Sequence, residues 1–123
     1  MTLKELYSKI GGDYEQVIRI LRVEKLVDKH IRKFARSEAV DSLRKAGQTM
    51  DSTALFEASH ALKGVSGNLG LVEICRLASQ ITEEFRPGHE RTMTDTEIRE
   101  KIDSVQALYA KVAEAVKEYE AQL

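Results

Sequence analysis

Cysteine, proline and tryptophan are nearly missing from this sequence, which has one cysteine, one proline and no tryptophan among its 123 residues. A single cysteine excludes a disulfide framework within the chain and fits a reducing compartment. We expect Cys75 to lie beside the apolar face of a helix as a small packing residue, and not to act as a nucleophile. With 42% hydrophobic and 32% charged residues, the composition is typical of one soluble helical domain.

Long apolar runs and an excess of one charge are also absent. No segment approaches the roughly 18 apolar residues of a membrane span. The 19 basic and 20 acidic residues give a net charge of −1, so nothing attracts nucleic acid or a membrane surface strongly. The charged, amphipathic start Met1–Glu5 is unlike a signal peptide. We therefore expect a cytoplasmic protein that binds neither nucleic acid nor membrane.

Strand-like alternation of polar and apolar residues appears nowhere, whereas apolar residues recur with helical spacing along the whole chain. The pattern predicts helices that begin near residues 2, 14, 24, 37, 52, 71 and 95. The first should stop at Gly11–Gly12, and Pro87–Gly88 should end the sixth. Side chains suited to cap helix starts precede four of them: Thr2 with Glu5, Asp13, Asp51, and Thr94 with Glu97.

The apolar residues of these segments define the expected core. They are Val17, Ile20 and Leu21; Val27, Ile31 and Phe34; Val40, Leu43, Ala46 and Met50; Leu55, Leu62 and Leu69; Leu71, Ile74, Leu77, Ile81 and Phe85; and Ile98, Ile102, Val105, Tyr109, Val112, Val116 and Tyr119. Four longer helices with short connections predict an all-α fold, an antiparallel four-helix bundle with short additional N-terminal helices. Residues 1–123 would form a single domain, with 1–22 as an N-terminal helical cap and 23–123 as the bundle.

A histidine and a lysine stand three residues apart in the fifth helical segment. At about 100° per residue, His60 lies about 160° around that helix from Leu62, so it points away from the core. Lys63 is its i+3 neighbour, and Gly64 and Gly67 fall on the same outward side. Each glycine costs a helix roughly 1 kcal/mol against alanine. A sequence that accepts this cost usually needs close approach from outside.

An uncovered histidine of this kind can carry a phosphoryl group. An unperturbed histidine titrates at about pH 6.5, so the neutral imidazole, a good nucleophile, is abundant at cytosolic pH. Attack on a phosphoryl group gives a phosphohistidine, and Lys63 can reach the phosphoryl oxygens as a point charge. Gly64, one turn beyond His60, leaves the distal ring nitrogen open to a large partner. Taken alone, a surface histidine beside a lysine is usually only a solvated face.

The run Ser59-His60-Ala61-Leu62-Lys63-Gly64, followed by Gly67-Asn68-Leu69-Gly70, resembles the motif of histidine-containing phosphotransfer (HPt) domains. These domains are intermediate carriers of bacterial phosphorelays, and their histidine lies mid-helix in a pattern close to A-H-x-L-K-G. Ser59 replaces the usual alanine, a small change that we expect not to matter. The N-terminal segment is similar to what some stand-alone bacterial members carry.

The resemblance implies a role for each residue of the motif. His60 would accept phosphate from the aspartyl phosphate of a response-regulator receiver domain and pass it to another, while Lys63 steadies the phosphoryl group. The implied partners are receiver domains and a hybrid sensor kinase, and the implied state is a monomer. Gly64, Gly67 and Phe56 are candidate docking residues, although we expect Phe56 to belong partly to the core.

Sequence patterns for the use of ATP are missing. Gly64 to Gly70 lacks the lysine that a Walker-type G-x-x-x-x-G-K-[ST] has after its second glycine, and no kinase catalytic motif is present. No acidic cluster resembles a receiver's aspartate pocket. We therefore expect a phosphoryl carrier and not an enzyme with an ATP site of its own. It would need no cofactor, since Mg²⁺ would be supplied at the partner receiver domain.

Two other classes stay open on the residues alone. Glu57 and His60 have the Glu-x-x-His spacing of di-iron bundles, but such sites need this motif twice, pointing inward. Neither His30 nor His89 supplies a second copy, and we assign neither a role. The other class is a bundle that binds receivers without accepting phosphate. Retention of both His60 and Lys63 argues against it.

Overall fold

Seven helices and no strand make up the regular structure of the computed structural model, which describes all residues from 1 to 123. The helices are α1 (Leu3–Ile10), α2 (Tyr14–Leu21), α3 (Glu24–Ala35), α4 (Ala39–Thr49), α5 (Ser52–Asn68), α6 (Val72–Glu84) and α7 (Asp95–Ala121). No helix combines the length and the apolar character needed to cross a membrane. The predicted all-α class is confirmed.

Local capping decides where several helices begin. Each of the four predicted caps, Thr2, Asp13, Asp51 and Thr94, accepts a hydrogen bond from a backbone N–H in the first turn of its helix. The two threonine caps form full capping boxes with the glutamates three residues later. At the end of α1, Gly11 has a φ of 70°, a left-handed conformation that glycine adopts without a steric penalty.

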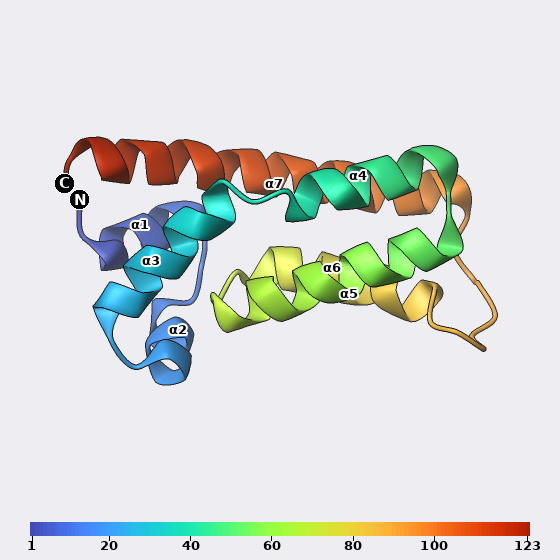
Figure 1. The fold of residues 1–123 in the computed structure, drawn as a ribbon, viewed down its shortest axis with the longest axis horizontal. Helices are drawn as coiled ribbons and strands as arrows, with labels where there is room; N and C mark the ends of the chain where they lie inside the picture. The colour runs from blue at the N-terminus through green and yellow to red at the C-terminus, as the bar shows by residue number, and fades with distance from the viewer.

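Helices α4 to α7 form the antiparallel bundle on one side of the molecule (Figure 1). In this bundle α4 packs against α5 and α7, and α6 also packs against α5 and α7. Helix α7 has 27 residues and runs past the end of the bundle, so its C-terminal half lies along α1 and α3. The predicted four-helix bundle with extra N-terminal helices is therefore what the chain forms.

The expected core is buried with four exceptions. Twenty-seven apolar residues form one buried cluster that includes residues from every helix. Ile20 is 44% exposed, and Leu21 is only half-buried. Met50 lies beyond α4 in a left-handed cap with a φ of 53°. Tyr109 is half-buried, and its hydroxyl donates a hydrogen bond to the carbonyl of Ala35, at 2.7 Å.

Helix α3 lies with the cap and not in the bundle, so the cap extends beyond the boundary expected at residue 22. It packs against α1, α2 and the C-terminal half of α7. Tyr119 of α7 donates a hydrogen bond to Asp28 at 2.6 Å, and Arg32 pairs with Glu120 at 2.9 Å. The extra length of α7 provides the surface that α3 covers, and α1 to α3 together form the cap.

The cap holds the turn between α5 and α6. Gly70 in this turn has a φ of 68°, and its carbonyl accepts a hydrogen bond from the Asp13 amide at 2.8 Å. A Cβ at Gly70 would lie 2.6 Å from the Asp13 carbonyl oxygen, so only glycine fits here. The buried hydroxyl of Tyr7 donates to the Leu69 carbonyl at 2.8 Å, and burial raises the pKa of this phenol. These contacts fix the end of the helix that carries His60.

Removal of the Tyr7 hydroxyl tests how strongly the cap holds this turn. Tyr7→Phe leaves the buried carbonyl of Leu69 without its partner, which costs about 1–3 kcal/mol of unfolding free energy. Urea unfolding measures the loss. Tyr14→Phe is the matched control, because the Tyr14 hydroxyl bonds only to exposed Glu24 and its removal should cost about 0.5 kcal/mol or less. Equal losses in the two variants would contradict this role of Tyr7.

Candidate functional site

His60 lies near the middle of α5 with its side chain exposed. The rotation of α5 about its axis is set by its buried residues, Leu55, Ser59, Leu62 and Ser66, which face the bundle core. Because His60 lies on the opposite side of the helix, its imidazole meets solvent. The prediction that it points away from the core is confirmed.

The imidazole of His60 stacks on the ring of Phe56, one turn earlier in α5. The two ring centroids are 5.6 Å apart and the ring planes differ by only 9°. Phe56 is half-buried and packs against the core, as expected, so it provides a fixed platform. Just past the end of α6, the guanidinium carbon of Arg86 lies 5.7 Å from the centre of the Phe56 ring. Stacking restrains the imidazole plane and leaves the ring edge, where both nitrogens lie, accessible.

Lys63 is half-buried beside His60, and its ammonium is not engaged in an ion pair. The charge of Lys63 acts on Glu83 of α6, but Glu83 pairs instead with Arg86 at 2.7 Å. The hydrogen bond from Arg86 lowers the pKa of Glu83, and Lys63 and His89 lower it further through their charge. Glu83 therefore stays ionised and bound to Arg86, and the Lys63 ammonium remains available for an incoming anion.

Behind His60, a polar link joins α5 to α6. Ser59 is fully buried, and its hydroxyl donates to the Leu55 carbonyl at 2.6 Å. Thr82 of α6 is also fully buried and donates to the Ser59 hydroxyl at 2.9 Å. Ser59 thus makes a specific contact between two helices, which its place in the motif did not reveal. This contact fixes the backbone next to His60 against α6.

The two glycines that follow His60 differ in their surroundings. Gly64 is exposed, and a Cβ there would meet no atom within 4 Å, so the space over this turn is open as predicted. Gly67 departs from the expectation of an open outward position. It is half-buried, and a Cβ there would lie 3.4 Å from the sulfur of Cys75 on α6. Gly67 therefore allows α5 and α6 to approach each other and is a poor candidate for contact with a partner.

No group of three or more histidine, cysteine, aspartate and glutamate side chains is placed to hold a metal ion. Glu57 and His60 are both exposed on α5 and do not point into the bundle. His89 is exposed in the loop after α6, whereas His30 of α3 is half-buried and lines a surface pocket. The geometry gives the di-iron hypothesis no support.

Residues 35–117 match the Hpt domain family. The chain belongs to this family. The match covers α4 to α6 and most of α7, and it includes His60 and every residue found around it. Hpt domains are phosphocarrier modules of phosphorelays and not ATP-dependent enzymes, so histidine phosphotransfer is the general role of this chain. No curated protein and no solved structure was found to match the chain.

Proposed function

We propose that His60 accepts a phosphoryl group from a receiver-domain aspartate and passes it to the aspartate of another receiver. One observation carries the proposal: the only histidine of α5 is exposed mid-helix within the Hpt domain, stacked on Phe56 with the open turn of Gly64 beside it. His30 lies outside the matched residues, and His89 lies in a loop.

The proposed step is a displacement at phosphorus. The lone pair of the distal ring nitrogen of His60 attacks the phosphorus, and an N–P bond forms. The P–O bond to the aspartate breaks, and the carboxylate leaves with its electron pair. The ring then carries a positive charge, which it loses when the proton on the other ring nitrogen passes to solvent. Passing the group onward is the same displacement in reverse on a second receiver.

Lys63 would stabilise the phosphoryl oxygens before and after transfer. Its free ammonium is the i+3 neighbour of His60, and side chains with this spacing lie about 5–6 Å apart at Cβ. The remaining transition-state charge would be neutralised by Mg²⁺ bound at the receiver domain. We therefore propose that the chain needs no cofactor of its own.

The proposed partners are receiver domains and a hybrid sensor kinase that carries one, and the proposed working form is a cytoplasmic monomer.

The proposed function is tested by incubating the chain with a panel of receivers that carry radiolabelled aspartyl phosphate. Label should move to the chain from at least one receiver and then to a second, unlabelled receiver. In a preparation free of kinases, ATP with Mg²⁺ should give no label. A receiver that binds tightly yet never transfers label would instead support a docking adaptor, and labelling by ATP alone would overturn the relay role.

A series of substitutions at Gly64 tests whether its open turn serves partner access. Gly64→Ala should transfer nearly normally and gain up to about 1 kcal/mol of stability, because the glycine is helical and nothing lies near a Cβ. Gly64→Phe should fold well but transfer poorly, since its ring would cover the approach to His60. Transfer rate and melting temperature are measured on the same samples.

The matched control for this series is Ala61→Phe, which places the same ring on an exposed α5 position about 100° around the helix from His60. It should slow transfer less than Gly64→Phe does. Transfer by Gly64→Phe at the wild-type rate would rule out the open-turn argument.

A further inference from the structure

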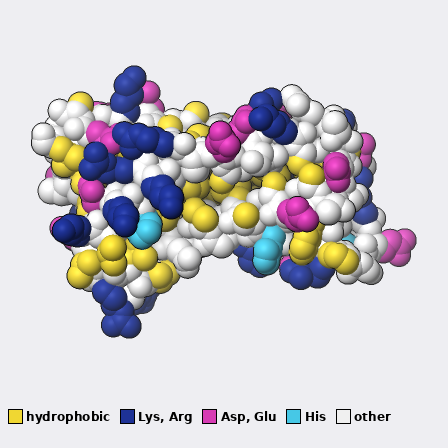
Figure 2. Space-filling view, viewed as in Figure 1, with side chains coloured by type: hydrophobic (Ala, Val, Ile, Leu, Met, Phe, Trp, Pro, Cys, Tyr) yellow, Lys and Arg dark blue, Asp and Glu magenta, His cyan; other side chains and the backbone are white.

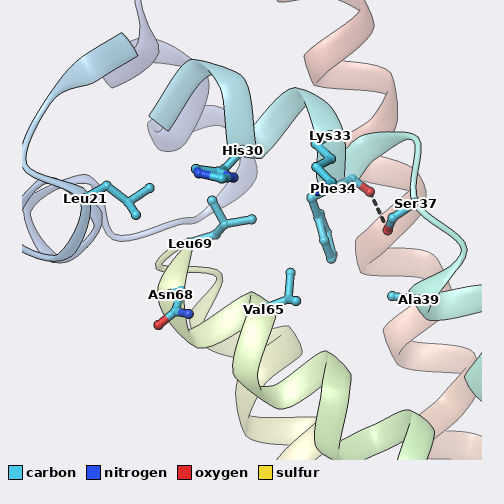
Figure 3. A pocket seen from close by; sticks show the side chains of 9 residues that line it. All are labelled: Leu21, His30, Lys33, Phe34, Ser37, Ala39, Val65, Asn68 and Leu69. Carbon is cyan, nitrogen blue, oxygen red and sulfur yellow. Dashed lines mark hydrogen bonds between the residues drawn. The ribbon is translucent and has the colours of Figure 1, made fainter. Parts of the chain in front are cut away.

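A pocket of about 270 Å³ lies between the cap and the bundle, away from His60. Helix α3 and the end of α2 form one wall, and α5 and the start of α4 form the other (Figure 3). Its nine lining residues are Leu21, His30, Lys33, Phe34, Ser37, Ala39, Val65, Asn68 and Leu69. Val65 projects from α5 toward α3 across the pocket and is 43% exposed. A cavity of this size suits one or two apolar side chains and is too small for most cofactors.

Apolar side chains continue from this pocket over the cap. Ile20, Val23 and Leu26, which lie on α2, α3 and the connection between them, are 44%, 51% and 38% exposed. Three of the six large exposed apolar residues of the chain are therefore within seven residues of sequence. We call these three residues and the pocket the cap surface. An apolar area of this kind on a small domain indicates a binding surface.

The cap surface is surrounded by positive charge. Residues 14–36 contain seven lysines and arginines against three acidic residues, a net charge of +4 in a chain whose total is −1. Figure 2 shows lysine and arginine side chains gathered over the α1–α3 end of the molecule, around hydrophobic ones. Arg32 and Arg36 are paired with carboxylates. The other five, Arg19, Arg22, Lys25, Lys29 and Lys33, have no carboxylate within ion-pair distance. The chain itself does not neutralise this charge.

The cap surface is distinct from the phosphoacceptor site. Its basic residues precede the Hpt domain match, which begins at residue 35. On α5, Val65 lies about 140° around the helix from His60, on the flank that faces α3. The pocket and the imidazole therefore open in different directions. A ligand of the cap surface does not need to contact the phosphoryl group.

We propose that the cap surface binds an acidic amphipathic helix of a partner protein. Apolar residues at i, i+3, i+4 and i+7 would enter the pocket and cover Ile20, Val23 and Leu26, while flanking carboxylates would meet the free lysines and arginines. An anionic membrane would also be attracted by the charge. The concave pocket with its buried walls, Phe34 and Leu69, favours a helix, because bilayers take up convex apolar faces.

The proposal is tested by nuclear magnetic resonance titration of the full chain with a synthetic peptide. The peptide has leucines at the amphipathic spacing and glutamates elsewhere, and a scrambled peptide of the same composition is the first control. Backbone amide shifts should change at Leu21, His30 and Val65 and not around His60. Binding should weaken with added salt. The dissociation constant of the scrambled peptide should be higher by roughly tenfold or more.

Two pairs of variants locate the binding surface. Val65→Glu should weaken peptide binding roughly tenfold or more, whereas Val72→Glu, at a comparably exposed valine on α6, should not. The double variant Lys29→Glu, Lys33→Glu should weaken peptide binding by a similar factor. Its control is the double variant Lys111→Glu, Lys117→Glu on α7, which makes an equal change of charge and should weaken binding far less. Melting temperatures confirm that each variant is folded.

Three results would overturn the proposal. The first is equal binding of the ordered and scrambled peptides, and the second is a set of shifts centred on His60. The third is that the peptide does not bind, whereas anionic phospholipid vesicles do, and that the Val65 and lysine variants reduce this vesicle binding. None of these results bears on whether His60 accepts phosphate, because that role is tested separately by label transfer from a phosphorylated receiver.

Discussion

His60→Gln should take up no label from any phosphorylated receiver. Glutamine has no nucleophilic ring nitrogen, so no N–P bond can form. The folded state should be nearly unchanged, within about 0.5 kcal/mol, because the exposed imidazole contributes little packing beyond its contact with Phe56. Label transfer measures the first effect, and thermal melting followed by circular dichroism measures the second.

His30→Gln and His89→Gln are the matched controls for this variant, and both should be labelled at the wild-type level. The label on the wild-type chain should also be lost in acid and kept in base, as expected of phosphohistidine. Normal labelling of the His60→Gln protein would show that another residue is the acceptor, and the function proposed for α5 would then be wrong.

Lys63→Ala should slow transfer roughly 10- to 100-fold. A charged hydrogen bond to a phosphoryl oxygen contributes about 1.5–3 kcal/mol, and a tenfold change in rate corresponds to ~1.4 kcal/mol. Folding should be spared, since Glu83 already has Arg86 as its partner. Single-turnover transfer from a phosphorylated receiver measures the rate.

Two further variants separate charge from general surface effects. Lys63→Arg keeps the charge on a different geometry and should retain part of the rate. Lys111→Ala removes an exposed lysine from α7 and should transfer normally. If Lys63→Ala transfers as fast as wild type, Lys63 is only a surface residue and its place in the mechanism is lost.

Much of the fold could be predicted because the signals are local. A threonine or aspartate at a helix start acts on N–H groups two or three residues away, and Gly11 ends α1 through its own backbone angles. The outward direction of His60 follows from helical geometry once Leu55 and Leu62 are known to be buried. These features depend on a few neighbouring residues, so the sequence alone reveals them.

The features that escaped prediction depend on contacts between distant segments. The side of Gly67 that meets Cys75 is determined by how α6 packs on α5, and the same packing joins Ser59 to Thr82. The Arg86 and Phe56 contact arises in the same way. No periodicity within one helix reports which residue of the next helix lies opposite.

The position of α3 was missed for a related reason. Its apolar spacing is as regular as that of the bundle helices, and Val27, Ile31 and Phe34 are buried as predicted. Its partner, however, is the part of α7 that extends beyond the bundle, and spacing does not name a partner. The exposure of Ile20 could not be seen either, because an apolar residue in a helical pattern looks the same in the core and on a binding surface.

The central claim is that the distal ring nitrogen of His60 carries the phosphoryl group, and direct observation of the N–P bond tests it best. The chain, labelled with ¹⁵N in its three histidines, is phosphorylated by a receiver and followed by nuclear magnetic resonance at neutral pH. We predict that phosphorus couples to one imidazole nitrogen only, the distal nitrogen of His60. Coupling to His30 or His89, or phosphorylation with all three imidazoles unchanged, would contradict the account.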